Sequence, residues 1–334
     1  MRPILPLLAM LVATAAAPAS AVIINPSDEA LAYLDQAIRV LETRFREDRS
    51  IDWVRLRTNA LLAAPQAVTP ADTYPAIREV VAALDSGRVV FQTPEDMAAV
   101  ASGDDQQEDF GIRAEKLAPN AGYLGIPVYT GPSRGRGQRF AETLQKQLAE
   151  LDGQGVCGWI IDLRNTRGGN LFPALAGIGP LLGSGVAGYF VNPDGRAEAW
   201  GYWRGSGRAE RAPETQVDIP YRLKRAKPPI AVLIGPQTAG GGEGLAVSFQ
   251  GRSNVRLFGA RTAAQTNLTD RLALADGAEF IFTVPTTLLD RLNRPYPQGV
   301  PPDETVGGGG TNGDHNDAAL AAAREWLASQ PGCE

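Results

Sequence analysis

The sequence has little histidine and no excess of basic charge. One histidine, His315, is present among 334 residues. A multi-histidine metal site is therefore excluded, and a Ser-His-Asp triad would have to use His315. With 32 basic and 37 acidic residues the formal net charge is −5, which argues against a nucleic-acid-binding protein. We expect no metal, no cofactor and no nucleic-acid partner.

Cysteine is equally scarce. The two cysteines, Cys157 and Cys333, cannot make a disulfide framework for a chain of this length. Cys157 leads into an apolar segment and is most simply a small buried side chain. A bridge to Cys333 can form in an oxidising compartment, but the spacing does not argue for it. Both states stay open.

Apart from the first residues, no apolar run is long enough to span a membrane. Residues 4–17 are apolar, follow the basic Arg2, and lead to Ala19-Ser20-Ala21, which fits a signal-peptidase site. The pattern predicts a signal peptide over residues 1–21, cleaved after Ala21. No cysteine follows that site, so we expect no lipid anchor. We expect a periplasmic or secreted protein without stable membrane insertion, and the oligomeric state stays open.

The N-terminal part of the mature chain has a helical pattern. Between residues 25 and 84 apolar side chains recur at spacings of three and four, as in Leu31, Leu34 and Ile38. Ser27 and Thr69-Pro70 are typical helix starts. We expect a helical N-terminal domain over residues 22–88 and a connecting loop region over residues 89–120.

From residue 121 short, continuously apolar segments alternate with helical ones. Strands are predicted over residues 123–126, 158–163, 230–234 and 255–258, and helices over residues 139–151, 243–249 and 317–327. Such strands are buried on both faces, so we expect an α/β fold with a βαβ core over residues 121–330. Asp276-Gly277 between two short runs predicts a β-hairpin within residues 274–285.

Two glycine-rich turns follow two of the buried strands. Residues 162–170 include Gly168 and Gly169, and residues 235–243 include Thr238 and Gly241. Ligands of α/β sheets bind beyond the carboxyl ends of strands, and consecutive glycines let backbone amides approach a ligand. The helix start at Glu243 adds partial positive charge. The turns predict an oxyanion-binding or substrate-binding site. The alternative is that they are merely tight loops.

The segment 158–169 resembles the strand and glycine turn of the S41 serine peptidases, the tail-specific or C-terminal-processing proteases. Segments 122–124, 238–243, 259–262 and 299–303 fall in that family's order, and residues 25–84 are similar to the helical cap of its tricorn-like members. The resemblance covers nearly all of the mature chain, without room for the family's PDZ module. It implies a crotonase-like core, serine peptidase chemistry, and peptide or protein substrates.

The sequence departs from the family at each catalytic position. Family members carry the nucleophilic serine three residues before the glutamate of the second turn, where this chain has Gly240. Glycine has no side chain that could attack a carbonyl. The lysine base of some members corresponds to Gln265, and the histidine base of tricorn-like members corresponds to Arg88. Glutamine takes no proton near neutral pH and arginine stays protonated, so neither acts as a general base.

Three residues elsewhere are alternative catalytic groups. Ser248 lies within the helix expected after Glu243 and is more simply a packing residue. Ser86 has only an arginine nearby, which cannot activate it. His315 follows a glycine run and is more simply a solvated residue near a helix start.

The retained residues predict binding. Gly168, Gly169 and Gly241 can offer amides to a peptide carboxylate, beside Thr238, and Arg88 would add a charge-assisted contact if it faces the cleft. We therefore expect an exported, catalytically deficient S41 homologue that binds peptides or protein C-termini. Two alternatives stay open: an active serine endopeptidase with an unrecognised nucleophile, and a structural or regulatory interaction module whose cleft is empty.

Overall fold

The computed structural model describes residues 25–46, 48–84, 87–101, 109–131, 133–209, 213–307 and 317–333. The expected signal peptide, residues 1–21, lies outside these ranges. The chain divides into two compact units, Met1–Asp85 and Ser86–Glu334. Within the described ranges, no helix combines the length and the apolar character needed to cross a membrane.

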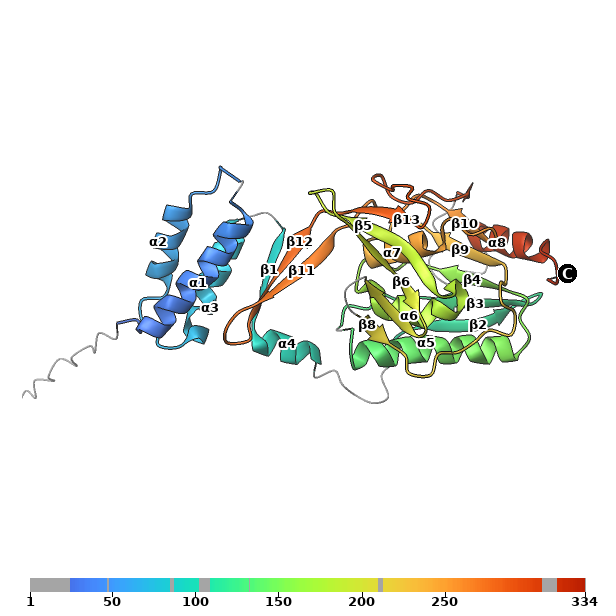
Figure 1. Ribbon diagram of the computed structural model, residues 1–334, viewed down its shortest axis with the longest axis horizontal. Helices are drawn as coiled ribbons and strands as arrows, with labels where there is room; N and C mark the ends of the chain where they lie inside the picture. Colours follow the sequence, from blue (N-terminus) through green and yellow to red (C-terminus); the bar gives the residue numbers. More distant parts are fainter. Residues whose placement is uncertain are drawn as a thin grey trace, which may run out of the picture. The chain divides into compact units, whose positions relative to one another are not determined.

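The first unit consists of helices, as the apolar spacing predicts. They are α1 (Asp28–Arg44), α2 (Trp53–Ala63), the 3-10 turn η1 (Pro70–Thr73) and α3 (Tyr74–Ala83) (Figure 1). The Ser27 hydroxyl caps α1 by accepting a hydrogen bond from the Ala30 amide. Leu34, Ile38 and Ile77 are fully buried, so the predicted apolar face does form the core of this unit.

A six-stranded sheet lies at the centre of the second unit. Its order is β14-β10-β9-β4-β3-β2, and every pair is parallel except β2 with β3. The strands are β2 (Arg113–Leu117), β3 (Ala121–Gly125), β4 (Gly158–Asp162), β9 (Ile230–Ile234), β10 (Val255–Gly259) and β14 (Glu304–Thr305). Parallel pairing places the carboxyl ends of β3, β4, β9 and β10 at one edge of the sheet.

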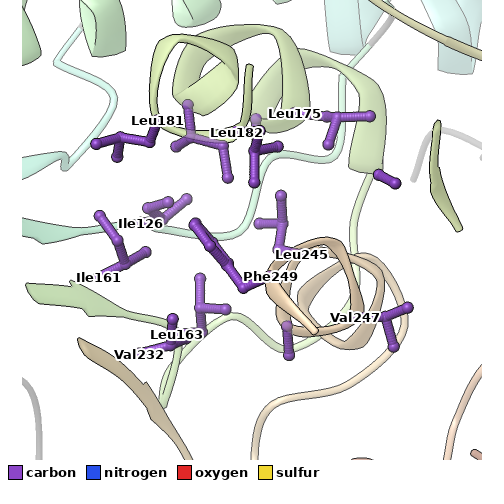
Figure 2. Close-up of a cluster of buried hydrophobic side chains, with 14 of the residues drawn as sticks. Ile126, Ile161, Leu163, Leu175, Leu181, Leu182, Val232, Leu245, Val247 and Phe249 are labelled. Atoms are coloured by element: carbon purple, nitrogen blue, oxygen red, sulfur yellow. The ribbon is translucent and has the colours of Figure 1, made fainter. Parts of the chain in front are cut away.

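Helices cover both faces of this sheet, as expected for an α/β fold. The helices are α5 (Arg136–Gly153), α6 (Leu171–Leu182), α7 (Gly241–Phe249) and α8 (Ala318–Ala328). Leu175 of α6 and Phe249 of α7 belong to one buried cluster with Ile161 of β4 (Figure 2). Leu320 of α8 packs with Ile160 on the other face. Neighbouring residues of β4 thus face opposite layers, which explains why the strand is apolar throughout.

Two antiparallel sheets complete the unit. One has the order β13-β5-β6-β7-β8, and the other has the order β1-β12-β11. Their strands are β1 (Val89–Gln92), β5 (Gly185–Val191), β6 (Ala197–Trp203), β7 (Ser206–Ala209), β8 (Pro213–Gln216), β11 (Leu268–Ala273), β12 (Glu279–Val284) and β13 (Thr287–Asp290).

A hairpin is present as β11 and β12, with the predicted turn, in which Gly277 adopts a φ of +88°. Its first strand, β11, lies before the predicted range of residues 274–285. Residues 89–120, expected as a connecting loop region, contain β1, α4 (Pro94–Ala101) and β2. Because β1 pairs with β12, this range holds sheet structure of the second unit.

A disulfide joins Cys157, directly before β4, to Cys333, beyond α8. The sequence left the pairing open, because 176 residues separate the two cysteines. The Arg225 guanidinium supports the same junction by donating to the carbonyls of Cys157 at 2.8 Å and Pro331 at 2.9 Å. The end of the chain is thus held at the beginning of β4.

We expect the double variant Cys157→Ser, Cys333→Ser to lose about 2–5 kcal/mol of unfolding free energy, because a bridge closing a long loop restricts the unfolded chain. Urea denaturation followed by circular dichroism measures the loss. A reductant should lower the stability of the natural chain to the same value and leave the variant unchanged. Equal stability of the two chains without reductant would contradict this expectation.

Candidate functional site

The two glycine turns are joined by their backbones at the carboxyl ends of β4 and β9. Arg167 and Ala239 form an isolated parallel bridge. The Ala239 amide donates to the Thr166 carbonyl at 3.1 Å, and the Gly168 amide donates to the Ala239 carbonyl at 2.8 Å. The sequence predicts two turns at neighbouring strand ends, and the structure brings them into direct contact.

This contact requires glycine. A Cβ atom on Gly241 would lie 2.6 Å from the Gly169 carbonyl oxygen, and one on Gly240 would lie 3.1 Å from Gly168 Cα. Gly168, Gly169 and Gly240 have φ values of +99°, +81° and +50°, which residues with a side chain rarely adopt. The glycines therefore bring two backbones together at this edge.

The amides of the turns have different partners. Gly168 donates to Ala239, and Gly240 donates to the Gln265 carbonyl at 2.9 Å. Within the described part of the chain, the amides of Gly169 and Gly241 donate to no protein acceptor. Gly241 is the first residue of α7, where an amide has no acceptor within the helix. Of the four glycine amides in these turns, those of Gly169 and Gly241 are therefore the two without an acceptor among the described residues.

Thr238 has an internal role. Its side chain is fully buried, and its hydroxyl donates to the Leu163 carbonyl at 2.9 Å and accepts from the Gly235 amide at 3.0 Å. Its carbonyl accepts from the Ala263 amide. Thr238 therefore connects the β4 turn, the β9 turn and the segment after β10, while its hydroxyl is directed into the protein.

Glu243 holds the segment after β10 against the second turn. Its buried carboxylate accepts from the amides of Ala264 at 2.9 Å, Gln265 at 2.7 Å and Gly240 at 3.3 Å, and from the Thr262 hydroxyl. In the sequence Glu243 marks a helix start and, through the family resemblance, the nucleophile position three residues before it. The local sequence around Glu243 does not predict its contacts with the segment after β10, because those three donors lie around twenty residues further along the chain.

The structure brings together two of the three positions that the resemblance matches to catalytic residues of the family. Gly240 and Gln265 are joined by their backbones, and the Gln265 side chain is exposed. Arg88 lies directly before β1, is exposed, and accepts a hydrogen bond from the Thr283 amide through its carbonyl. Arg88 therefore belongs to the surroundings of the three-stranded sheet.

The alternative nucleophile Ser248 is fully buried in α7, and its hydroxyl donates to the Leu245 carbonyl at 2.6 Å. That hydroxyl packs within its own helix. The other two alternatives, Ser86 and His315, lie outside the described residues.

A buried charge cluster lies under the first turn. Arg164 donates to Asp162 from two guanidinium nitrogens and pairs with Asp317, the N-cap of α8. Burial alone would lower the pKa of Arg164, but the hydrogen bonds and charge of Asp162 raise it above its ordinary value. Burial and the Asp162 charge raise the pKa of Tyr123, which donates to the same carboxylate. Two carboxylates neutralise this cation, so it is not available to a ligand.

Arg167 is an exposed cation of the first glycine turn. Its guanidinium donates to the side-chain oxygen of Gln237 at 2.5 Å, and both side chains are exposed. This pair connects the two glycine turns at their outer surface. Sequence reasoning missed Arg167, although its place directly before Gly168-Gly169 was a usable signal.

Comparison with known proteins agrees with this architecture. Residues 120–306, more than half of the chain, match the sequence model of Peptidase family S41. The chain belongs to peptidase family S41. Its relatives include the nisin-resistance protein of Lactococcus lactis subsp. lactis, 27% identical over 84% of this chain and 81% of the relative. The carboxyl-terminal-processing protease of Synechocystis sp. is 27% identical over 50% of this chain and 36% of its own.

Solved structures share the fold of this S41 protein. A lipoprotein from Streptococcus agalactiae superimposes with a TM-score of 0.65 and 20% identity over 91% of this chain and 97% of its own. The photosystem II D1 C-terminal processing protease superimposes with a TM-score of 0.53 and 17% identity, over 84% of this chain and 94% of its own. Peptidases of family S41 act on peptide or protein substrates.

We expect Glu243→Gln to lower the free energy of unfolding by about 2–3 kcal/mol, because the amide nitrogen would face backbone donors that then lack an acceptor. Urea denaturation measures the change. The matched control is Glu150→Gln, an exposed position on α5, which should change the stability by less than about 0.5 kcal/mol. Equal effects of the two variants would show that the buried carboxylate is dispensable.

Proposed function

We propose that this protein is an exported, catalytically deficient S41 homologue that binds peptides or protein C-termini at the paired glycine turns. One observation carries the proposal. Gly240 occupies the nucleophile position, while the neighbouring Gly169 and Gly241 amides have no acceptor among the described residues. In this proposal the chain keeps hydrogen-bond donors for a carbonyl or carboxylate, and the neighbouring Gly240 provides no nucleophilic side chain.

The deficiency rests on chemistry at three positions. Gly240 has no side-chain oxygen or sulfur that could act as a nucleophile. The side chain of Gln265 cannot accept a proton near neutral pH. A guanidinium such as that of Arg88 does not act as a general base. The one described alternative serine, Ser248, has its hydroxyl buried in α7.

Binding is supported by the two amides that have no acceptor among the described residues and by charge. Amides that do not move on binding cost little reorganisation, so they stabilise an oxyanion or a carboxylate efficiently. Arg167 adds an exposed positive charge at the same turn, and charge-assisted hydrogen bonds are stronger than neutral ones. Peptide ends supply both a carbonyl oxygen and a carboxylate.

Export is supported by the apolar N-terminal pattern with its cleavage site and by the disulfide between Cys157 and Cys333. Disulfides persist in oxidising compartments such as the periplasm or the extracellular space. We place the mature protein there, with the site in residues 121–330 and the helical domain over residues 22–88.

We expect the mature chain, residues 22–334, to release no fragments from fluorescently labelled unfolded casein above the buffer background. Gly240→Ala should give the same baseline, and an active serine peptidase added to the same substrate confirms that it can be cleaved. Cleavage by the natural chain would contradict the proposed catalytic deficiency and favour the alternative, an active endopeptidase with an unrecognised nucleophile.

Binding is tested with a fluorescent casein-derived peptide and fluorescence anisotropy. We expect Gly241→Ala to weaken binding about tenfold or more, because the added methyl group collides with the Gly169 carbonyl and displaces a donor. Gly153→Ala is the control, since a Cβ there meets nothing within 4 Å. Equal affinities of these variants, or no binding by the natural chain, would favour a structural module whose cleft is empty.

A further inference from the structure

The irregular segment between β8 and β9 combines exposed apolar and basic side chains. Ile219 is 91% exposed, more than any other large hydrophobic residue in the described ranges. Four basic residues follow within six positions, Arg222, Lys224, Arg225 and Lys227, and all are exposed. A chain of net charge −5 thus presents a local concentration of positive charge beside an exposed isoleucine.

The basic side chains of this segment form no ion pairs with described carboxylates. None of the four basic side chains pairs with a carboxylate within the described residues. Asp218 is exposed and is the single acidic residue of the segment 218–227. Asp152 lies underneath and is buried. Four cations against one exposed carboxylate leave a net positive surface.

The backbone of the segment is fixed from the inside. The Tyr221 amide donates to the side chain of Gln145 at 2.7 Å. Asp152 accepts from the Tyr221 hydroxyl at 2.8 Å and from the Lys224 amide at 2.9 Å. Leu223 packs against the main core. The segment is therefore held in place while Arg222, Lys224 and Lys227 remain exposed.

We propose that residues 219–227 form a docking surface for a membrane of anionic phospholipids. Cations near such a surface gain electrostatic attraction, and an exposed isoleucine gains when it enters the boundary between headgroups and acyl chains. A dissolved polyanion would bind the cations but would provide no apolar environment for the Ile219 side chain. The combination of the two features therefore selects a lipid surface.

The position of the segment is compatible with ligand binding at the glycine turns. Residues 219–227 lead into the beginning of β9 at Ile230, whereas the second glycine turn follows the other end of β9 at Ile234. A membrane bound at the first edge leaves the second edge accessible. Docking would hold the protein at the membrane surface with its peptide site uncovered.

The test is sedimentation of the mature chain with vesicles of equimolar phosphatidylglycerol and phosphatidylcholine, compared with pure phosphatidylcholine vesicles. We expect binding to the anionic vesicles, weakened by added salt. Replacing Arg222, Lys224 and Lys227 together by serine should weaken the partition coefficient about 100-fold, since each surface cation contributes about fivefold. Arg225 is kept because it holds the carbonyls of Cys157 and Pro331.

The matched control replaces three exposed arginines elsewhere with serine, which changes the net charge by the same amount. These are Arg49, Arg55 and Arg196. It should bind at least about tenfold better than the first triple variant. Ile219→Ser should weaken vesicle binding about tenfold and leave binding to heparin unchanged. Circular dichroism confirms that each variant is folded.

Two results would overturn the proposal. Equal vesicle binding by the two triple variants would show that only the net charge matters, and that the segment is simply solvated. Unchanged vesicle binding by Ile219→Ser, together with strong binding to heparin, would show that the segment recognises polyanions and has no specific use for a lipid surface.

Discussion

The site depends on the close contact of two backbones at the carboxyl edge of the sheet. Hydrogen bonds from Ala239 to Thr166 and from Gly168 to Ala239 continue the pairing of β4 and β9 beyond the strands. Two parallel strands normally diverge into separate loops at this point. Here their continued pairing aligns the Gly169 and Gly241 backbones, and this alignment excludes side chains.

A buried carboxylate extends this arrangement to a third strand end. Glu243 accepts hydrogen bonds from the segment after β10 and from Gly240, so it fixes both to the first turn of α7. An acidic side chain at this end of a helix is also favoured by the helix dipole. The arrangement of the two glycine turns and the segment after β10 is thus maintained by one buried carboxylate and by backbone hydrogen bonds.

Local patterns predicted the features that depend on local chemistry. The apolar strands β4, β9 and β10 and helices α1, α2 and α3 follow from periodicity and caps. Helix α6 was missed because ten of its twelve residues are buried and Pro180 lies inside it, so it shows no polar face. The disulfide and the internal role of Thr238 depend on residues far apart in the chain, and periodicity carries no information on such contacts. The partner of each glycine amide was equally beyond prediction, since peptide orientation is set by tertiary contact.

The conformation of Gly240 bears on whether a side chain could be introduced at this position. Its φ of +50° and ψ of −114° lie outside the regions that a residue with a side chain adopts without strain. A serine would add this strain to a 3.1 Å contact of its Cβ with Gly168 Cα. It would also meet Gln265, which cannot take its proton. Glycine avoids both the strain and the contact, so the close packing of the two turns depends on the absence of a side chain at position 240.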